Sequence, residues 1–369
     1  MTGTKFKLTY MGILALPLLF HLLLVGGGAL LSSAPHSAAA SSDDPLWHWY
    51  LKPQQQWPER ASGATADLAP LPVPPTQEPN AVALGERLFH DPALSGDGTV
   101  SCSSCHNSST AFADQQRVSP GVEGRQGKRN AQSLLDVHLW QRLFWDNRAG
   151  SLEEQARGPL EDPNEMDSSI AHAVTYVRSN YEGYEQVDWW TLAAALAAYQ
   201  RTLTLAGQPK NRLDQFLHAI AEHDYANARK RLSTQELEGL HLFRTKAGCL
   251  RCHNGPLLSD QQLHVTGLHY YGRTYEDLGA WEQQQHIGNL GAFRTPMLRD
   301  LMASRPWMHN GLFNNMKGII NFYRHGGARV TPPSSQLLPQ PFPAVSDKLV
   351  PFELTHEEQD ALLAFLQML

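Results

Sequence analysis

Two five-residue stretches, Cys102-Ser103-Ser104-Cys105-His106 and Cys249-Leu250-Arg251-Cys252-His253, carry all four cysteines of this 369-residue chain. In both stretches two residues separate the cysteines, and a histidine follows the second cysteine directly. This is the spacing of c-type haem attachment, in which both thiols bind the haem covalently and the histidine ligates its iron. We therefore predict two covalent c-type haems, with His106 and His253 as the proximal iron ligands.

Two other uses of paired cysteines fit less well. A structural zinc site takes cysteine and histidine ligands, but it does not require a histidine after the second cysteine in both copies. A thioredoxin-type redox pair favours a βαβ context, whereas the sequence around both pairs is typical of helices and glycine-rich loops. The repeat of the whole five-residue pattern decides for haem.

Length and composition indicate a globular protein of about two domains. One hydrophobic core seldom supports 369 residues, and 42% hydrophobic with 18% charged residues is ordinary for a folded chain. The formal net charge of -6 gives no basic surface for phosphate groups, so we expect no nucleic acid partner.

The N-terminal 40 residues are typical of an export segment. Lys5 and Lys7 precede an apolar stretch over 8–31, and small residues at 38–40 offer a cleavage site. The apolar stretch is close to the ~20 residues that cross a bilayer, so residues 1–40 are either a cleaved signal peptide or a membrane anchor. The glycines at 26–28 and the cleavage site favour the signal peptide. Both alternatives place the folded part in the periplasm, soluble or anchored at the inner membrane.

The next segment and the two halves that follow it have distinct patterns. Residues 41–80 are rich in Pro, Ser and Gln, and we expect a tether whose aromatic residues pack on the protein. Similar stretches at 85–89 and 239–243 precede the haem motifs and predict helices that lie against the haems. Apolar helices over 189–205 and from Thr355 onward close the two halves. We therefore expect a mostly α fold of two tandem cytochrome c-like domains, at 81–215 and 230–369.

The segments around both motifs resemble the bacterial dihaem cytochrome c peroxidase and MauG superfamily. The resemblance covers roughly residues 68–369 and rests on residues 84–89, 129–130, 144–149, 152–160, 165–166, 293–299, 308–311 and 322–323. It implies an oxidoreductase that uses hydrogen peroxide and takes electrons from a small periplasmic donor, a cytochrome c or a cupredoxin. Dihaem peroxidases commonly dimerise, so a homodimer is a further expectation.

The resemblance also implies how the first haem is ligated. In conventional dihaem peroxidases a histidine sixteen residues after the first proximal histidine closes that haem. Here that position is Val122, which cannot ligate iron, so we expect an open, high-spin first haem. Over its open face the resemblance places Glu165 as the acid/base group that cleaves peroxide, helped by Gln155.

For the second haem, conventional peroxidases have a methionine ligand fourteen residues after the histidine that matches His309. This chain has Tyr323 there, as in the MauG-like subset with His/Tyr ligation. A phenolate favours ferric and higher iron, so this haem would store an oxidising equivalent. The alternative is that Tyr323 is a core aromatic and that Met308 or Met316 is the ligand.

Two further roles follow from the resemblance. Trp145 matches the tryptophan between the haems, which relays an electron vacancy, although plain core packing is its ordinary use. Asn130, with the backbone carbonyls of Ser304 and Pro306, matches an interhaem calcium site. Three arginines are candidates to support the haem propionates or this calcium site, namely Arg129, Arg294 and Arg299.

Three functions are compatible with these residues. The first is reduction of hydrogen peroxide, and the second is a MauG-like oxidase that acts on tryptophans of a partner protein. MauG carries a surface tryptophan two residues before its second haem motif, where this chain has Ala247, which weakens the second function. The third, a dihaem electron carrier without turnover, has no use for Gln155 and Glu165 above an open haem.

Overall fold

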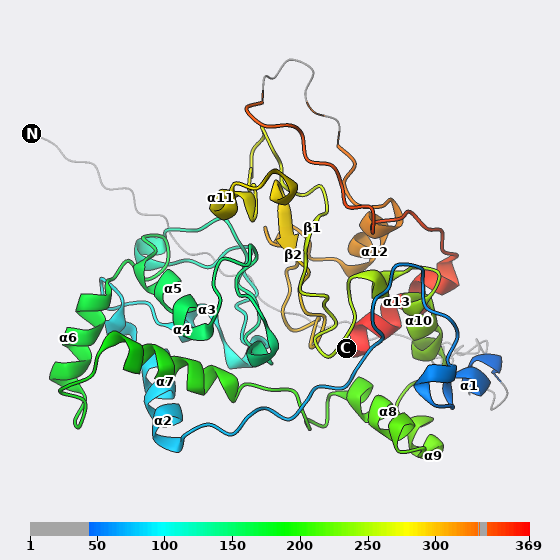
Figure 1. The fold of residues 1–369 in the computed structure, drawn as a ribbon, viewed down its shortest axis with the longest axis horizontal. Helices are drawn as coiled ribbons and strands as arrows, with labels where there is room; N and C mark the ends of the chain where they lie inside the picture. The colour runs from blue at the N-terminus through cyan, green and yellow to red at the C-terminus, as the bar shows by residue number, and fades with distance from the viewer. Residues whose placement is uncertain (1–43, 331, 333–337) are drawn as a thin grey trace, which may run out of the picture. The chain divides into compact units, whose positions relative to one another are not determined.

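The computed structural model describes residues 44–330, 332 and 338–369, and Figure 1 shows its fold. The signal peptide or anchor predicted at 1–40 lies outside these residues. Across the described ranges, no helix is both long and apolar enough to cross a membrane.

Helices dominate the regular structure, as the sequence predicted. Their bounds are α1 Pro45–Tyr50, α2 Pro79–Phe89, α3 Cys102–Cys105, α4 Leu152–Gln155, α5 Arg157–Glu161, α6 Ile170–Asn180, α7 Trp189–Arg201, α8 Arg212–Ala221, α9 Tyr225–Ala228, α10 Thr234–Arg244, α11 Trp281–Gln284, α12 Met316–Arg324 and α13 His356–Met368. In the described part of the chain there is one small sheet, in which β1 (Leu263–Val265) pairs antiparallel with β2 (Ala292–Arg294).

The first half is built on a close crossing of α2 and α7 (Figure 1). A Cβ on Gly85 would overlap the backbone carbonyl of Ala195, so a glycine is required where the two helices meet. One turn further along α2, Phe89 packs against Tyr199 of α7 with ring centroids 5.1 Å apart. This crossing fixes the wall of the first half from which α2 side chains reach inward.

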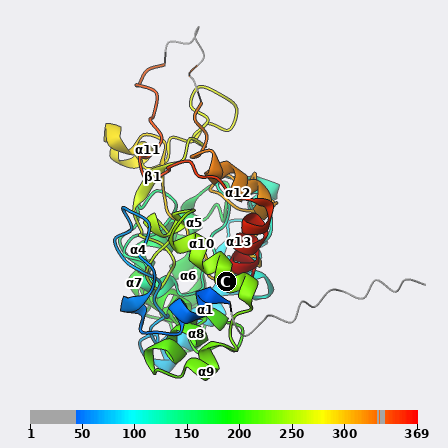
Figure 2. The ribbon, with the colours of Figure 1, turned by 90° about the vertical axis from the view of Figure 1, so that its right-hand side faces the viewer.

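The second half repeats this crossing with α10 and α13, which lie together in both views (Figure 2). A Cβ on Gly239 would overlap the carbonyl of Ala361, and Phe243 packs against Phe365 with centroids 5.3 Å apart. Capping boxes begin both helices, since Ser233 pairs with Glu236 and Thr355 with Glu358. The similar stretches at 85–89 and 239–243 therefore do equivalent packing in the two halves.

Two large clusters of buried apolar side chains correspond to these halves. One draws on residues between Leu84 and Leu203, and the other on residues from Leu213 to Met368 together with Trp47–Leu68. Leu213 falls inside the range expected for the first domain, yet it packs with the second half. The division into two cytochrome c-like domains stays our interpretation of these clusters.

From Pro45 onward, the expected tether is packed protein. Trp47, Tyr50 and Trp57 are buried in the cluster of the second half, where Trp57 stacks on Phe216 of α8. Burial of these large rings provides the apolar contact that an extended, polar tether would lack. We call residues 45–71 the strap.

A buried arginine holds the strap in place. Arg244 of α10 is 1% exposed, and its Nε donates to Asp67 Oδ1 at 3.0 Å. The same guanidinium donates to the Tyr50 hydroxyl at 3.0 Å and to the Pro58 carbonyl at 3.2 Å. Because the strap supplies all of these acceptors, removing it would leave a buried charge without partners.

Candidate functional site

Each Cys-x-x-Cys-His motif lies in the wall of a cavity. The first cavity, about 840 Å³, is lined by Cys102, Cys105 and His106 together with Leu88 and Phe89 of α2. The second cavity has two adjoining parts of about 780 and 1060 Å³, and Cys249 and His253 line both. Both motifs therefore border space in which a bound cofactor could lie.

Both proximal histidines are oriented for iron. Nδ1 of His106 lies 2.9 Å from the Phe112 carbonyl, and Nδ1 of His253 lies 2.9 Å from the Leu258 carbonyl. A carbonyl only accepts, so Nδ1 carries the proton and Nε2 keeps its lone pair free for a metal. Burial lowers the pKa of both imidazoles, which keeps them neutral as ligands. The same arrangement in both halves fits the predicted haem ligation.

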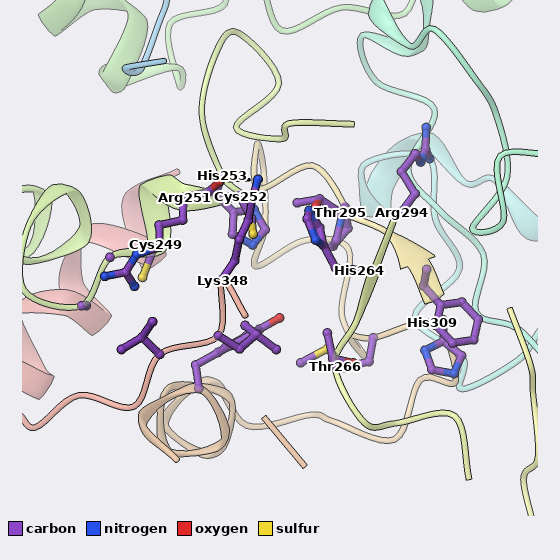
Figure 3. A pocket seen from close by; sticks show the side chains of 18 of the residues that line it. Cys249, Arg251, Cys252, His253, His264, Thr266, Arg294, Thr295, His309 and Lys348 are labelled. Carbon is purple, nitrogen blue, oxygen red and sulfur yellow. Dashed lines mark hydrogen bonds between the residues drawn. The ribbon is translucent and has the colours of Figure 1, made fainter. Parts of the chain in front are cut away.

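Two buried nitrogens near the second cavity have no partner among the described residues. They are Nε of Arg294 and Nε2 of His309, whose side chains are both about 3% exposed. Figure 3 shows His309 at one end of this cavity and Arg294 leading away from it. Burial lowers the pKa of Arg294 to about 9, because no carboxylate of the described chain pairs with it. An acidic group such as a haem propionate would supply the missing acceptor, so these residues fit a bound haem.

The three candidate arginines therefore differ. Arg129 is already paired with Asp146 at 2.6 Å and with Asp277 at 2.7 Å, and Arg299 with Asp214 at 2.5 Å. The pairs with Asp277 and Asp214 join segments 148 and 85 residues apart, so the sequence did not reveal this structural role. Arg294 alone of the three keeps a donor free for a propionate.

Trp145 stands between the cavities. It lines both parts of the second cavity and also a middle cavity of about 1880 Å³ that reaches Cys105 and His106. Its indole Nε1 donates to the Asn130 carbonyl at 2.9 Å, and its own carbonyl accepts from the N–H of Arg294 at 2.8 Å. The predicted relay role of Trp145 stays a prediction, with which this position agrees.

The acid/base candidates lie in the first cavity. Gln155, the last residue of α4, and Glu165, in the loop after α5, line both the first and the middle cavity with His106. Burial, together with the nearby carboxylate of Asp162, raises the pKa of Glu165 to about 7, against a smaller opposing effect of Arg148. A carboxyl group with this pKa both takes up and releases protons near neutral pH.

Val122 is 2% exposed and packs in the apolar cluster of the first half. Its backbone N–H donates to the backbone carbonyl of Glu165 at 2.8 Å. The two loops approach each other so closely that a Cβ on the preceding Gly121 would overlap the Asn164 carbonyl. No iron ligand is therefore available from position 122, which agrees with the expected open haem.

Several residues that could be the distal iron ligand of the second haem line the second cavity. Tyr323 of α12 and Met308 line both parts of the second cavity, and Met316 lines one part. Burial raises the pKa of Tyr323, so its phenol would lose a proton only to a strong Lewis acid such as ferric iron. Ligation by Tyr323 thus stays a prediction, with Met308 or Met316 as the alternative.

The residues of the predicted calcium site also lie together. Asn130, Ser304 and Pro306 line one part of the second cavity, next to Trp145. The Asn130 amide nitrogen donates to the Gln116 carbonyl at 2.8 Å, which points its carbonyl oxygen away from that contact. Calcium at this place stays a prediction.

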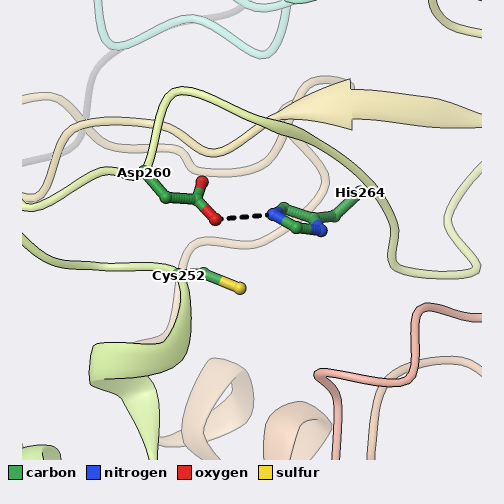
Figure 4. Close-up of side chains that lie close together, drawn as sticks. All are labelled: Cys252, Asp260 and His264. Atoms are coloured by element: carbon green, nitrogen blue, oxygen red, sulfur yellow. Dashed lines mark hydrogen bonds and ion pairs between the residues drawn. The ribbon is translucent and has the colours of Figure 1, made fainter. Parts of the chain in front are cut away.

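A charged group beside the second motif was missed from the sequence. His264 of β1 pairs with Asp260 at 2.8 Å, and Cys252 lies beside them (Figure 4). Although burial opposes it, the hydrogen bonds to Asp260 and Cys252 raise the pKa of His264 to about 9. Three such groups could hold a metal, but Cys252 is a haem-attachment thiol, so the pair is better described as support for that loop. The four-residue spacing of Asp260 and His264 was the available signal.

Comparison with known proteins agrees with this geometry. A family model described as di-haem cytochrome c peroxidase matches residues 79–222. The cytochrome-c peroxidase IdrP1 of Pseudomonas sp. strain SCT is 32% identical, in an alignment that covers 82% of this chain and 85% of that protein. The chain belongs to the di-haem cytochrome c peroxidase family.

Members of the family with other names are also similar. The methylamine utilization protein MauG of Methylorubrum extorquens is 31% identical, over 82% of this chain and 82% of that protein. A crystal structure of a MauG-like protein associated with microbial copper homeostasis superposes with a TM-score of 0.68 at 29% identity, covering 82% of this chain and 93% of that one. The diheme peroxidase BthA of Burkholderia thailandensis gives a TM-score of 0.61 at 25% identity, covering 84% and 92%. As a di-haem peroxidase the chain is an oxidoreductase with two c-type haems.

Proposed function

We propose that this di-haem peroxidase reduces hydrogen peroxide to water in the periplasm, with electrons from a small redox protein, a cytochrome c or a cupredoxin. The observation that carries the proposal is the contact of two residues. Val122, whose side chain cannot ligate iron, is hydrogen-bonded through its N–H to Glu165. Glu165 lines the cavity of His106, and its pKa of about 7 suits proton transfer. An electron carrier without turnover would have no use for such a group.

The chain's residues define the proton path. A bound haem with an open face supplies the iron at which peroxide binds and its O–O bond is broken. Glu165 as carboxylate accepts the proton of the nearer peroxide oxygen and returns it to the farther oxygen, which leaves as water. Gln155 beside it donates an amide N–H that holds peroxide in place. With two electrons and two protons taken up, one peroxide gives two waters.

The second haem is proposed to hold one of the two oxidising equivalents. Tyr323 would close its distal side, and Trp145 would let the two haem sites exchange electrons. A calcium ion on Asn130, Ser304 and Pro306 would stiffen the wall beside Trp145.

The MauG-like alternative receives no support from position 247. Ala247 is 4% exposed and lines the second cavity, so no redox-active side chain connects that cavity to the surface there. Trp307 also lines the second cavity, but it is 8% exposed and donates its Nε1 to the Leu301 carbonyl at 2.9 Å. It lies inside the protein, where a partner cannot reach it.

The test uses the purified holoenzyme. It is mixed with hydrogen peroxide and a reduced monohaem cytochrome c, and donor oxidation is followed with and without prior one-electron reduction of the enzyme. We expect two donors oxidised per peroxide, without a need for prior reduction since the first haem is open. Absence of turnover in both states would reject the function, and a low-spin, fully ligated first haem at rest would reject the open site.

A further inference from the structure

A short segment near the C-terminus forms one wall of the second cavity. Residues 346–352 contain no helix or strand, and we call them the cover segment. Four of them line the cavity, namely Lys348, Leu349, Val350 and Phe352. Val350 is also 47% exposed, so at this point the wall between the cavity and water is one side chain thick. A haem in this cavity therefore depends on the cover segment for its separation from solvent.

The backbone of the cover segment is attached at both ends. The N–H of Ser346 donates to the Val265 carbonyl of β1 at 2.9 Å, and the N–H of Phe352 donates to the Arg324 carbonyl at 3.1 Å. Arg324 is the last residue of α12, the helix that also carries Tyr323. The segment thus runs from β1 to the helix of the predicted distal ligand.

Between these ends, one side chain joins the cover segment to the second haem motif. Lys348 Nζ donates to the Arg251 carbonyl at 3.3 Å and to Asp260 Oδ2 at 3.1 Å. Figure 3 shows Lys348 directed toward this motif. The Asp260 side chain is only 5% exposed and that of Lys348 is 29% exposed. An ion pair so shielded from water is stronger than one on an open surface.

Asp260 is a fixed point for this lysine. Its Oδ1 accepts from the Thr295 hydroxyl at 2.8 Å, and its Oδ2 pairs with His264 of β1 at 2.8 Å. Its backbone N–H donates to the Cys252 carbonyl at 2.6 Å. Because β1 and the haem motif both hold Asp260, the lysine ties the cover segment to a part of the chain that cannot easily move.

We propose that Lys348 fastens the cover segment over the second cavity, and that the fastened segment keeps hydrogen peroxide and other small ligands away from the second haem. The inference rests on the proposed function, in which only the first haem binds peroxide, and it adds a residue that separates the roles of the two haems. Lys348 acts through the segment and not on a reacting atom, so it is a positioning residue.

The residues beside Lys348 suit this role. Leu349, Val350 and Phe352 present apolar side chains to the cavity, which offer no hydrogen bond to water or peroxide. Without the ion pair, the middle of the segment would lose its attachment to the haem motif, and small molecules would gain access between Val350 and the cavity.

The first experiment counts bound ligands. Sodium cyanide, a small ligand of ferric haem, is titrated into the oxidised holoenzyme, and absorbance gives the number bound per protein. We expect one in the wild type, at the open first haem, and two in Lys348→Met. Lys348→Arg keeps the charge and should bind one. Two in the wild type, or equal numbers in the wild type and Lys348→Met, would overturn the inference.

A matched control separates this effect from the loss of any lysine pair in the second half. Lys317 of α12 pairs with Asp360 at 2.7 Å, and both side chains are about half exposed. Lys317→Met removes the same charge without touching the cover segment, so it should bind one cyanide. A second cyanide in Lys317→Met would contradict a specific role of Lys348.

The second experiment probes the cover segment directly and needs no ligand. Thermolysin cuts before accessible leucines, and peptide mass spectrometry locates its cleavage before Leu349. This cleavage should be roughly tenfold or more faster in Lys348→Met than in the wild type, because local opening becomes easier. Covalently attached haem per protein should be unchanged. Equal cleavage rates would show that Lys348 does not hold the segment and would overturn the inference.

Turnover separates this inference from the proposed function. If the wild type oxidises a reduced cytochrome c with peroxide while Lys348→Met binds no extra cyanide, the inference fails and the peroxidase function stands. If the wild type shows no turnover, the peroxidase function fails, whereas an extra cyanide in Lys348→Met still supports the cover.

Discussion

The backbone N–H of Val122 donates a 2.8 Å hydrogen bond to the backbone carbonyl of Glu165. In conventional members of the family, position 122 would be expected to hold the histidine that closes the first haem. Here valine stands at that position, and the same loop fixes the backbone of the proposed acid/base residue. In the proposed function, this one segment would provide both the access of peroxide and the placement of Glu165.

Removal of the Glu165 carboxylate should abolish most of the reaction with peroxide. Glu165→Gln keeps the size of the side chain but cannot accept a proton, so we expect the rate of the peroxide-induced spectral change to fall by about 10²-fold or more. Stopped-flow absorbance measures this rate. Glu123→Gln, which changes a side chain that is 75% exposed in the neighbouring loop, is the matched control and should react as the wild type does. A Glu165→Gln enzyme with an unchanged rate would remove Glu165 from the mechanism.

The peroxide reaction should depend on pH through the same group. Because the carboxylate form accepts the proton and the pKa of Glu165 is about 7, the rate should rise about tenfold from pH 6 to pH 8. Glu165 is influenced by Asp162, which raises its pKa, and by Arg148, which lowers it. Asp162→Asn should therefore move the whole profile to lower pH. A profile that does not move in this variant would contradict the assignment.

Replacement of Tyr323 should change the potential of the second haem. Tyr323→Met exchanges an anionic ligand for a neutral thioether and should raise the reduction potential by on the order of 0.1 V, within the ~0.8 V range that axial ligands cover. A spectroelectrochemical titration reads this directly. Met308→Leu serves as the comparison, and if this variant shifts the potential while Tyr323→Met does not, Met308 is the ligand.

The positive charge of Arg294 should influence a haem reduction potential. A buried cation near a haem favours the reduced form, so Arg294→Gln should lower a haem reduction potential without loss of covalently attached haem. Arg142→Gln, an exposed arginine of the adjacent segment, should leave the potential unchanged. Equal potentials in all three proteins would show that no haem propionate lies at Arg294.

The strap should contribute measurably to stability. Asp67→Asn takes one charge from the pair with Arg244, whose side chain is 2% exposed, and should lower the free energy of unfolding by about 3 kcal/mol. Denaturant unfolding followed by circular dichroism measures the loss. Glu353→Gln breaks a pair in which the glutamate side chain is 91% exposed, and it should change stability by less than about 0.5 kcal/mol.

The sequence was informative where the chemistry is local. The spacing within Cys102–His106 and Cys249–His253 and the capping residues Ser233 and Thr355 act over a few residues, so they could be read directly. The pairing of Arg129 with Asp277, or of Arg244 with Asp67, joins residues about 150 or more positions apart, and no local pattern encodes it.

The strap shows a second reason why the sequence did not predict the whole fold. Pro-rich and polar composition over 41–80 predicted a tether, but three buried aromatic rings and one carboxylate attach its first half to the second half of the chain. The propensity of the backbone was overridden by tertiary contacts of a few large side chains.

The hydrogen bond from Trp145 to Asn130 sets what kind of charge this indole can carry. Its Nε1–H points at a peptide carbonyl, which is far too weak a base to take the proton away. In the proposed relay, Trp145 would therefore give up an electron and keep its proton, becoming a cation. No nucleus then has to travel when charge passes between the two halves, so this transfer should be insensitive to pH and to replacement of solvent hydrogen by deuterium.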